Sequence, residues 1–252
     1  MDYLDGTPCW ADLITSSLPQ AQEFYAGLFG WTYQAQHSGE LESYLCAYKD
    51  GHLVAGLLAS SGHPDAGTGW TTYLQVQNVE ATVNAAQMHE GEIYLKPVYM
   101  PSQGSLAVIG EPSGIGVGLW ESGSHPEFEL RASHGAPAWH ELRSDTFHQT
   151  AGFYEKVLGW RLRCFNDSHH AHYHVLGRHH DLRTAVRDFS HEPGRDSGWH
   201  IYFQVDDIHE AGALAESLGG TLLRPVHPST LGLTAEIADP GGAAFSIVQP
   251  AV

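Results

Sequence analysis

The sequence predicts an α+β protein made of two tandem copies of one domain. Each copy is expected to contain two units with the order strand, helix and three strands. Three observations predict this class: motifs that return 129 residues later, amphipathic helices that end at glycine, and short strands separated by turn residues.

The internal repeat is the strongest of the three. Residues 10–13 (WADL) return as 139–142 (WHEL), and residues 70–76 (WTTYLQV) return as 199–205 (WHIYFQV). The Phe-Tyr pair at 24–25 returns at 153–154 with the same spacing to a following Gly-Trp. Motifs that recur in the same order at one offset indicate two copies of one domain. We call equivalent residues of the two copies twins, and twins that differ mark where the copies have specialised.

The first unit shows the expected helix clearly. Ala21, Phe24, Tyr25 and Leu28 form an i, i+3, i+4, i+7 stripe, and Gly30 follows as a C-terminal stop. Strands are expected around this helix at 11–15, 31–36, 43–48 and 53–59.

The same pattern then recurs along the chain. A strand at 70–77 and a helix at about 79–90 precede strands near residues 93, 106 and 117, and the second half is expected to have helices near 151–158 and 208–218. Residues 124–136 lack sustained periodicity and are expected to link the halves. The predicted domains are therefore residues 1–123 and 137–252.

Composition limits the class of partner. Twelve basic and 29 acidic residues give a formal charge of −17, which disfavours nucleic acid and anionic membranes. No run of about 18 apolar residues occurs, and residues 1–5 lack the basic and apolar regions of a signal peptide. Three scattered cysteines fit a reducing compartment. We expect a cytoplasmic protein that binds a small molecule, as a monomer or a homodimer.

These motifs resemble those of the glyoxalase/bleomycin-resistance/dioxygenase superfamily, whose members are also called vicinal oxygen chelate proteins. The chain is most similar to two-domain actinobacterial proteins with Trp-x-Glu-Leu and Tyr-Phe-x-Val-Asp-Asp motifs, many of which are described only as hydroxylases. The resemblance implies tandem glyoxalase-like domains, whose βαβββ units form curved-sheet cups around a small ligand. Function stays open, because this superfamily contains isomerases, lyases, ring-cleaving oxygenases and non-catalytic drug-binding proteins.

The resemblance also supplies a test for a metal. Metal enzymes of this superfamily take ligands from the first strand of each unit and from the closing strand. The matching positions of the second half are Trp139, His200 and Ser246, and those of the first half are Trp10, Thr71 and Gly118. A divalent cation needs about three nitrogen or oxygen ligands. No metal and no other cofactor is therefore expected.

The second half nevertheless offers acid–base groups. Residues two apart on a strand share a face, so Glu141 points with Trp139, and Tyr202 and Gln204 point with His200. A carboxylate, an imidazole and a phenol around one cavity could transfer protons without metal. We expect His200, Glu141 and Tyr202 to be catalytic. The side chains expected to bind ligand are Trp139, Gln204, Ser246, His172, His174, Trp10, Asp12 and Tyr73. A simpler interpretation remains, in which Glu141 and Asp12 do no more than anchor the backbone.

Histidine is concentrated in the second half, with thirteen of 18 after residue 126. His170, His172 and His174 alternate, so a strand would place them on one face. A solvated sheet edge is the simpler interpretation of this segment. If the strand instead faces the cup, His172 or His174 could complete a site with His200.

The leading hypothesis is a metal-independent enzyme of small-molecule secondary metabolism. It would act on an apolar, aromatic or polyketide-like metabolite by proton-transfer-assisted isomerisation, cyclisation, elimination or hydroxylation, with His200 or Glu141 as base and Tyr202 as hydrogen-bond donor. One alternative is a non-catalytic protein that sequesters a metabolite, as drug-resistance relatives do. Others are a lyase or dioxygenase whose metal is held by His200, Glu141 and a histidine from 170–174, and an interaction protein with filled cups.

Overall fold

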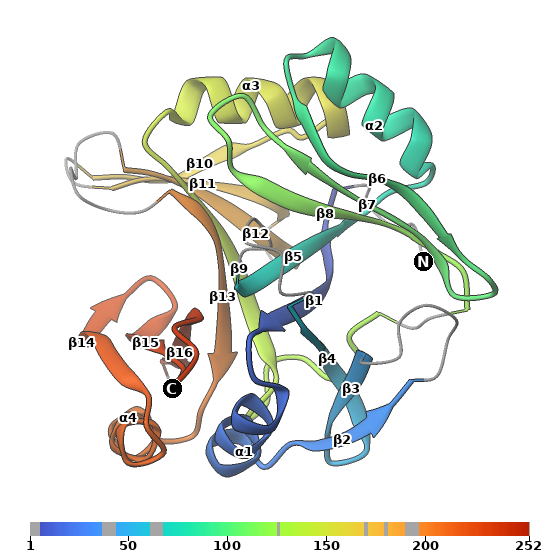
Figure 1. Ribbon diagram of the computed structural model, residues 1–252. Coiled ribbons are helices and arrows are strands. Elements are labelled where there is room, and N and C mark those ends of the chain that lie inside the picture. Colours follow the sequence, from blue (N-terminus) through green and yellow to red (C-terminus); the bar gives the residue numbers. More distant parts are fainter. Residues whose placement is uncertain are drawn as a thin grey trace. The chain divides into compact units, whose positions relative to one another are not determined.

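The computed structural model describes residues 6–36, 44–60, 68–124, 127–168, 171–178, 181–189 and 197–251. Within these ranges the chain forms two sheets and four helices, so the predicted α+β class is confirmed (Figure 1). None of the helices in this described part is long and apolar enough to cross a membrane.

The first half of the chain forms one eight-stranded sheet with the order β2-β3-β4-β1-β5-β8-β7-β6. β1 pairs with β4, and β5 with β8, in parallel, while the hairpin neighbours are antiparallel. The strands are β1 (Pro8–Thr15), β2 (Thr32–Ala35), β3 (Tyr44–Lys49), β4 (His52–Ala59), β5 (Gly69–Gln75), β6 (Glu92–Met100), β7 (Gly104–Gly110) and β8 (Gly116–Ser122).

The second half repeats this topology, with the order β10-β11-β12-β9-β13-β16-β15-β14. Its strands are β9 (Pro137–Ser144), β10 (Arg163–Ser168), β11 (Ala171–Arg178), β12 (Asp181–Asp188), β13 (Gly198–Gln204), β14 (Thr221–Ser229), β15 (Gly232–Ala238) and β16 (Ala244–Gln249). The helices are α1 (Leu18–Phe29), α2 (Val79–Met88), α3 (Phe147–Leu158) and α4 (Ile208–Ser217). Four βαβββ modules therefore follow one another, at residues 8–59, 69–122, 137–188 and 198–249.

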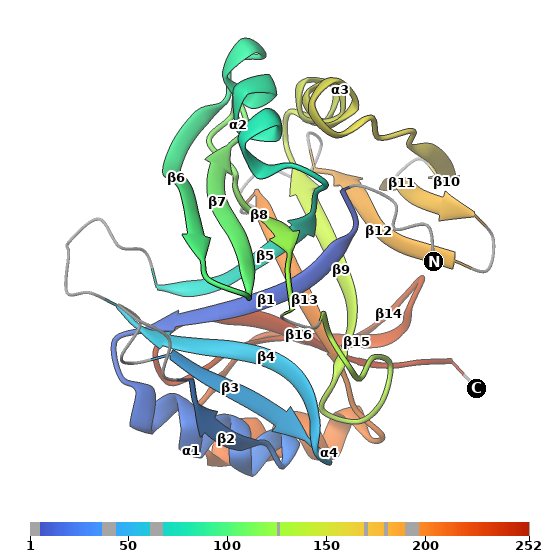
Figure 2. The same cartoon turned by 90° about the vertical axis from the view of Figure 1, so that its right-hand side faces the viewer.

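The compact units of the molecule do not coincide with its sequence halves. Unit 1 consists of residues 1–10, 72–126 and 140–200, and unit 2 consists of residues 11–71, 127–139 and 201–252. Unit 1 thus combines most of the second and third modules, and unit 2 most of the first and fourth. Helices α2 and α3 accordingly lie side by side in both views, as do α1 and α4 (Figures 1 and 2). Each predicted half corresponds to one sheet, whereas each hydrophobic core draws on both halves.

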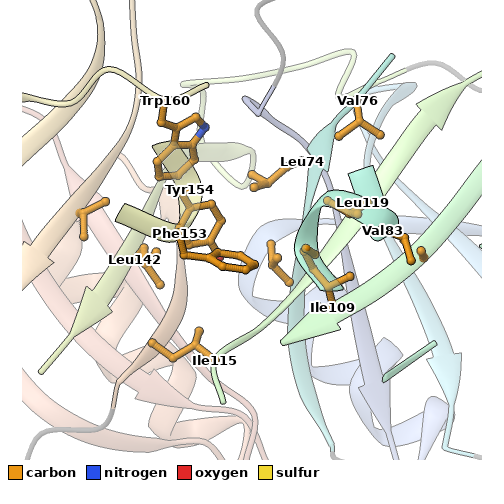
Figure 3. Packing of buried hydrophobic residues seen from close by; sticks show 14 of the residues in the cluster. Leu74, Val76, Val83, Ile109, Ile115, Leu119, Leu142, Phe153, Tyr154 and Trp160 are labelled. Carbon is orange, nitrogen blue, oxygen red and sulfur yellow. The ribbon is translucent and has the colours of Figure 1, made fainter. Parts of the chain in front are cut away.

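The core of unit 1 joins two modules through apolar side chains. Leu74 and Ile109 come from the second module, and Phe153 and Tyr154 from α3 of the third (Figure 3). All four side chains are almost fully buried. Burying a side chain of the size of Phe153 contributes about 1.5–3 kcal/mol, so this contact between modules contributes substantially to the stability of unit 1.

Unit 2 has an aromatic core of its own. The Tyr25 and Trp31 rings stack with centroids 5.2 Å apart, and Phe29 packs against Phe203 at 5.1 Å. Phe245 completes the contact from β16, with its ring centroid 5.6 Å from that of Tyr25. These residues come from the first and fourth modules, so unit 2 is held together in the same way as unit 1.

The repeat extends to the ends of the helices. Gly30 and Gly159 close α1 and α3 in the left-handed conformation, with φ of 71° and 67°, as the sequence predicted for Gly30. At the N-terminus of α4, the Asp207 carboxylate accepts hydrogen bonds from the amides of His209 and Glu210. These bonds lower the pKa of Asp207, because they stabilise the ionised form.

Candidate functional site

The faces of the third module are fixed by its core residues. Leu142 on β9 and Val186 on β12 both belong to the buried core of unit 1. Alternation along a strand therefore places Glu141, Arg143 and Arg187 on the opposite face of the sheet. The parallel register brings Arg143 of β9 beside Arg187 of β12.

A buried ion pair lies on this face. Arg143 donates from Nε to Glu141 Oε1 at 2.9 Å, and the two residues are only 7% and 3% exposed. A carboxylate and a guanidinium removed from water are tolerated only when they are paired and hydrogen bonded. Glu141 is therefore held by an arginine two residues further along its own strand.

Arg187 extends this group toward an aromatic ring. Its guanidinium carbon lies 4.6 Å from the centroid of Phe189, and that of Arg143 lies 5.7 Å from the same centroid. Guanidinium groups at such distances are attracted to the negative face of an aromatic ring. Two arginines thus share one buried phenylalanine.

His200 belongs to the same unit and responds to Arg143. Its neighbour Trp199 packs toward the core of unit 1 and donates from Nε1 to the Tyr154 hydroxyl at 3.1 Å. Alternation therefore turns His200, which is partly buried, to the other face of β13. Burial, and then the positive charge of Arg143, hold the pKa of His200 well below its ordinary value of 6.5. The imidazole is neutral at neutral pH.

We call these five residues of unit 1, Glu141, Arg143, Arg187, Phe189 and His200, the arginine cluster. It contains His200 and Glu141, two of the three predicted catalytic residues; Arg143 is hydrogen bonded to Glu141, and its charge helps to lower the pKa of His200. Arg187 and Phe189 were not predicted from the sequence. A comparison of equivalent positions in the two halves could have found Arg187, because Arg143 and Arg187 correspond to the apolar Ile14 and Leu58 in the first half.

Four further candidates of the second half belong to unit 2. Tyr202 of β13 lies beside Ser246 of β16 in parallel register, and both are buried. Gln204 pairs with Val248 in the same ladder and is partly exposed. Trp139, on the part of β9 that belongs to unit 2, is partly buried.

The first-half candidates have different surroundings. In unit 2, the Tyr44 hydroxyl donates to Asp12 Oδ1 at 2.7 Å, so the acid of this half is bound to a phenol. In unit 1, Tyr73 lies over Gly118, where an added Cβ would meet its ring. Trp10 is 5% exposed. Near Asp12, burial raises the pKa of the Cys46 thiol to about 11, and the Asp12 carboxylate adds to this effect.

The histidine-rich segment lies mostly outside the described residues, which exclude residues 169–170 and 179–180 and the side chain of His172. His174 is described, and its ring lies 4.4 Å from that of Phe147. In the β-sheet register His174 pairs with Val186, a core residue. The structure therefore places His174 on the helix-covered face of the sheet, away from the face that carries Glu141.

The donor set does not fit the metal centre of the superfamily. The three matching positions hold an indole, an imidazole and a hydroxyl, at Trp139, His200 and Ser246. Glu141, the nearest carboxylate in sequence to Trp139, is bound to the guanidinium of Arg143, whose charge repels a cation. Among the described residues, no group of three or more His, Cys, Asp or Glu side chains could hold a metal ion.

Comparisons with known proteins agree with this fold. A glyoxalase-like domain model matches residues 141–248. The chain is 32% identical to "Putative glyoxylase CFP32" of Mycobacterium tuberculosis, over 99% of this chain and 97% of that protein. It is 26% identical to the anthracycline biosynthesis protein DauV of Streptomyces sp. strain C5, over 98% and 94% of the two chains.

Solved structures with low sequence identity share the architecture. The Mn(II)-bound glyoxalase from Novosphingobium aromaticivorans aligns with a TM-score of 0.65 at 15% identity, over 97% of this chain and 82% of that one. The 2,3-dioxygenase LapB from Pseudomonas sp. KL28 gives the same TM-score and identity, over 99% and 94%. With the end-to-end relative at 32% identity, these findings show that the chain belongs to the glyoxalase/bleomycin-resistance/dioxygenase superfamily.

Proposed function

We propose that the protein is an enzyme of secondary metabolism that transfers a proton on an aromatic or polyketide-like metabolite without using a metal. The observation that carries this proposal is the arginine cluster. A neutral imidazole, His200, lies within the field of a buried guanidinium, Arg143, that is itself fixed by Glu141. A base beside a fixed positive charge suits the removal of a proton next to a carbonyl group.

The relatives support the class of metabolite. Two relatives that match nearly the full chain are named as anthracycline biosynthesis proteins, from Streptomyces sp. strain C5 and Streptomyces peucetius. Anthracyclines are aromatic polyketides with ketone and phenol groups. We therefore propose a substrate that carries an enolisable ketone on or near an aromatic ring system.

Three residues of the cluster have distinct proposed roles. His200 accepts the proton, since its imidazole is unprotonated at neutral pH. Arg143 stabilises the oxyanion of the resulting enolate, because a fixed positive charge favours developing negative charge. Glu141 positions Arg143 and does not act as the base, because its Oε1 accepts a hydrogen bond from that arginine.

Return of the proton to another carbon would complete an isomerisation, and loss of a leaving group would complete an elimination. Both outcomes begin with the same proton abstraction, and neither step requires a metal or an oxidant. Isotope exchange at the abstracted position therefore reports the proposed chemistry before the product is known.

The experiment is deuterium exchange into an anthracycline aglycone that carries an enolisable ketone. We expect the wild-type protein to catalyse exchange in D2O, measured by mass spectrometry, and His200→Ala to lose it by about 10²-fold or more. His209→Ala is the control, because His209 is an exposed histidine on α4. Exchange that His200→Ala leaves undiminished would remove His200 from this role.

Two rival functions predict different results, the first in this exchange experiment and the second in elemental analysis. Tight stoichiometric binding of the aglycone without exchange would indicate a sequestering protein. A stoichiometric metal in untagged protein that is lost in His200→Ala would indicate a metal-dependent lyase or dioxygenase.

A further inference from the structure

We propose that the first half of the chain binds a planar, uncharged aromatic ring system on one face of β6 and β7. This site goes beyond the proposed function, which places its chemistry on residues of the second half. All residues of the proposed site belong to unit 1.

Helix α2 packs against one face of β6 and β7 (Figures 1 and 2). Ile109 of β7 shares the core of unit 1 with Val83 of α2, and Ile93 of β6 packs against that core. Alternation along β7 and its register with β6 place four aliphatic side chains on the face away from α2. These side chains, which we call the apolar face, are those of Leu95, Val98, Leu106 and Val108.

The apolar face is open to solvent. Leu95 and Val98 are 41% and 42% exposed, and Leu106 and Val108 beside them are partly buried. Single exposed aliphatic residues are common on protein surfaces, whereas contiguous ones indicate a site of interaction.

The apolar face is specific to the first half. In the register, Leu95 pairs with Val108. At the equivalent positions of the second half, Arg224 pairs with Glu236. The same framework therefore accepts two side chains of opposite charge where the first half has two aliphatic ones.

The next pair along the strands differs in the same way. Val98 pairs with Leu106 in the first half. Its twin pair is His227 and Thr234, whose side chains are hydrogen bonded between Nε2 and Oγ1 at 3.2 Å. Folding of these strands thus does not require the four aliphatic residues, and recognition of an apolar ligand accounts for them.

Tyr94 adds an aromatic ring to the apolar face. A Cβ added at Gly110 would collide with this ring, and one added at Gly116 would touch it. Gly110 follows Val108 by two residues on β7, so the ring lies on the apolar face. Its hydroxyl donates to the carbonyl of Gly114 at 3.0 Å. Tyr94 is nevertheless 47% exposed, so much of this anchored ring remains accessible.

The seat of this ring is also specific to the first half. In the register of the second half, a leucine, Leu223, takes the place of Tyr94. Alanines, Ala238 and Ala244, take the places of the two glycines under the ring. The aromatic residue and the space that it needs therefore occur together, which indicates a ring placed for contact with a ligand.

The chemistry of this face selects an uncharged aromatic ligand. Aromatic rings favour stacked or edge-to-face contact with another ring, and aliphatic side chains accept their apolar surface. Burial raises the pKa of Tyr94, and the negative charges of Glu92 and Glu111 add to this effect. The same two charges disfavour an anionic ligand beside Tyr94.

The edge of the sheet disfavours another protein chain as the occupant. β6 is the last strand of its sheet, and Lys96 and Pro97 lie in its middle. Proline has no amide hydrogen to donate, and a lysine on an edge strand opposes pairing with a further strand. Three side chains that are less than half exposed also provide far less than the roughly 800 Å² per partner of a stable protein interface. The occupant is therefore a small molecule.

The first test titrates the full chain with 2-naphthol by calorimetry. We expect 2-naphthol to bind with a Kd of about 0.1–1 mM. Its saturated analogue 2-decalol should bind about two- to tenfold more weakly, because it cannot stack on Tyr94. Failure of 2-naphthol to bind, or equal binding of 2-decalol, would overturn the inference.

Two variants locate the binding. Leu95→Arg/Val108→Glu introduces the twin pair and should weaken 2-naphthol at least about tenfold, because the charged pair would lose water on binding. Tyr94→Leu, which introduces the twin residue, should abolish the preference for 2-naphthol over 2-decalol. Unchanged 2-naphthol binding in the double variant, or a preference that survives Tyr94→Leu, would place the ligand elsewhere and overturn the inference.

The anion 2-naphthoate tests the requirement for an uncharged ligand. The apolar face should not bind this anion, so Leu95→Arg/Val108→Glu should not weaken its binding. Weaker binding of 2-naphthoate in the double variant would show that the face accepts an anion, which contradicts the proposed ligand class.

Leu223→Ala is the matched control in unit 2, because Leu223 is the twin of Tyr94 and is 53% exposed. It should leave 2-naphthol binding unchanged, and a loss equal to that of the double variant would indicate non-specific contact with exposed apolar residues. Thermal unfolding of the double variant should match that of the wild type within a few degrees. If the double variant does not fold, the preference lost or kept in Tyr94→Leu decides the inference. A wild-type dimer in sedimentation that the folded double variant dissociates would mean that a second copy covers the face, and would overturn it.

The outcomes separate this inference from the proposed function. If the double variant loses 2-naphthol while the wild type catalyses no exchange, the aromatic site stands and the enzymatic proposal is wrong. If His200→Ala abolishes exchange while the double variant binds 2-naphthol normally, proton transfer stands and the aromatic site is wrong.

Discussion

Arg143 donates from Nε to Glu141 Oε1 at 2.9 Å, between two residues of one strand that are both almost fully buried. The twin acid in the first half, Asp12, is instead bound by the hydroxyl of Tyr44, which lies on another strand. Both halves therefore keep a buried carboxylate at one position and satisfy it with different chemistry. This difference generates the first two predictions.

Loss of Arg143 should be strongly destabilising. Arg143→Ile removes the guanidinium bound to the buried Glu141 carboxylate, and uncompensated burial of a charge typically costs about 3–5 kcal/mol. The free energy of unfolding in urea measures the effect. The double variant Glu141→Leu/Arg143→Ile buries no charge and should recover at least about 2 kcal/mol of that loss. A double variant that is no more stable than Arg143→Ile would show that the cost came from packing.

The space around Asp12, the acid of the first half, should leave no room for a larger side chain at Gly56. An added Cβ at Gly56 would collide with the Tyr44 hydroxyl and with Asp12 Oδ1, so Gly56→Ala must displace their hydrogen bond. We expect a loss of about 1–3 kcal/mol in the free energy of unfolding. The second half has Ala185 at the twin position, opposite Glu141, so the same methyl group is accepted beside the acid of that half.

A second Gly→Ala change provides the control. Gly152 lies within α3, and an added Cβ there meets nothing within 4 Å. Gly152→Ala should stabilise the protein by about 0.5–1 kcal/mol, because alanine favours the helix and restricts the unfolded chain. Similar losses in Gly56→Ala and Gly152→Ala would contradict the steric explanation.

Local signals in the sequence were sufficient to predict the fold. The Phe-Tyr stripe and Gly30 predicted α1, and the structure ends that helix with Gly30 in the left-handed conformation. The four-residue difference at α3, which begins at Phe147 where the sequence suggested residue 151, arises because Phe147 packs into the core of unit 1. The exchange of modules between units could not be predicted, because a repeat identifies copies and not the partner against which each copy packs.

The candidate site was predictable only in part. Alternation alone placed Glu141 and Trp139 on one face, and it also paired His172 with His174. It could not tell which face of β11 meets the core, and the structure places His174 there against Phe147. Arg187 was missed because its proximity to Arg143 depends on the parallel register of β9 and β12, which are separated along the chain by α3 and a hairpin.

Two tyrosines at twin positions provide the third prediction. The Tyr25 hydroxyl accepts a hydrogen bond from Trp70 at 3.0 Å and donates to Asp239 Oδ2 at 3.1 Å, so it bonds the first module to the fourth within unit 2. The Tyr154 hydroxyl accepts a hydrogen bond from Trp199 at 3.1 Å in unit 1.

Tyr25→Phe should therefore cost more than Tyr154→Phe, about 2–3 against about 1 kcal/mol, because it leaves the partly buried Trp70 indole and also the buried Asp239 carboxylate without that hydroxyl. Urea unfolding of the two variants measures the difference. A double-mutant cycle with Asp239→Asn should give a coupling energy of at least about 0.5 kcal/mol for Tyr25. A cycle without coupling would mean that the hydrogen bond between modules does not contribute to stability.

The fourth prediction concerns the pH dependence that His200 confers. Its pKa in the folded protein lies well below 6.5, because of burial and the charge of Arg143, so below pH 6.5 the unfolded chain binds a proton that the folded chain does not. The stability associated with neutral His200 is therefore fully present above pH 6.5 and is lost as the pH falls. The loss approaches a limit of about 1.4 kcal/mol per pH unit between the unfolded and folded pKa values.

Other histidines also titrate, so the informative quantity is the difference between the wild type and His200→Gln, measured by urea unfolding from pH 7.5 down to about 5. We expect this difference to shrink as the pH falls and the exchange rate to persist below pH 6.5. A difference that stays constant over this range would mean that His200 is as readily protonated in the folded protein as in the unfolded chain, and would remove the electrostatic link between His200 and Arg143.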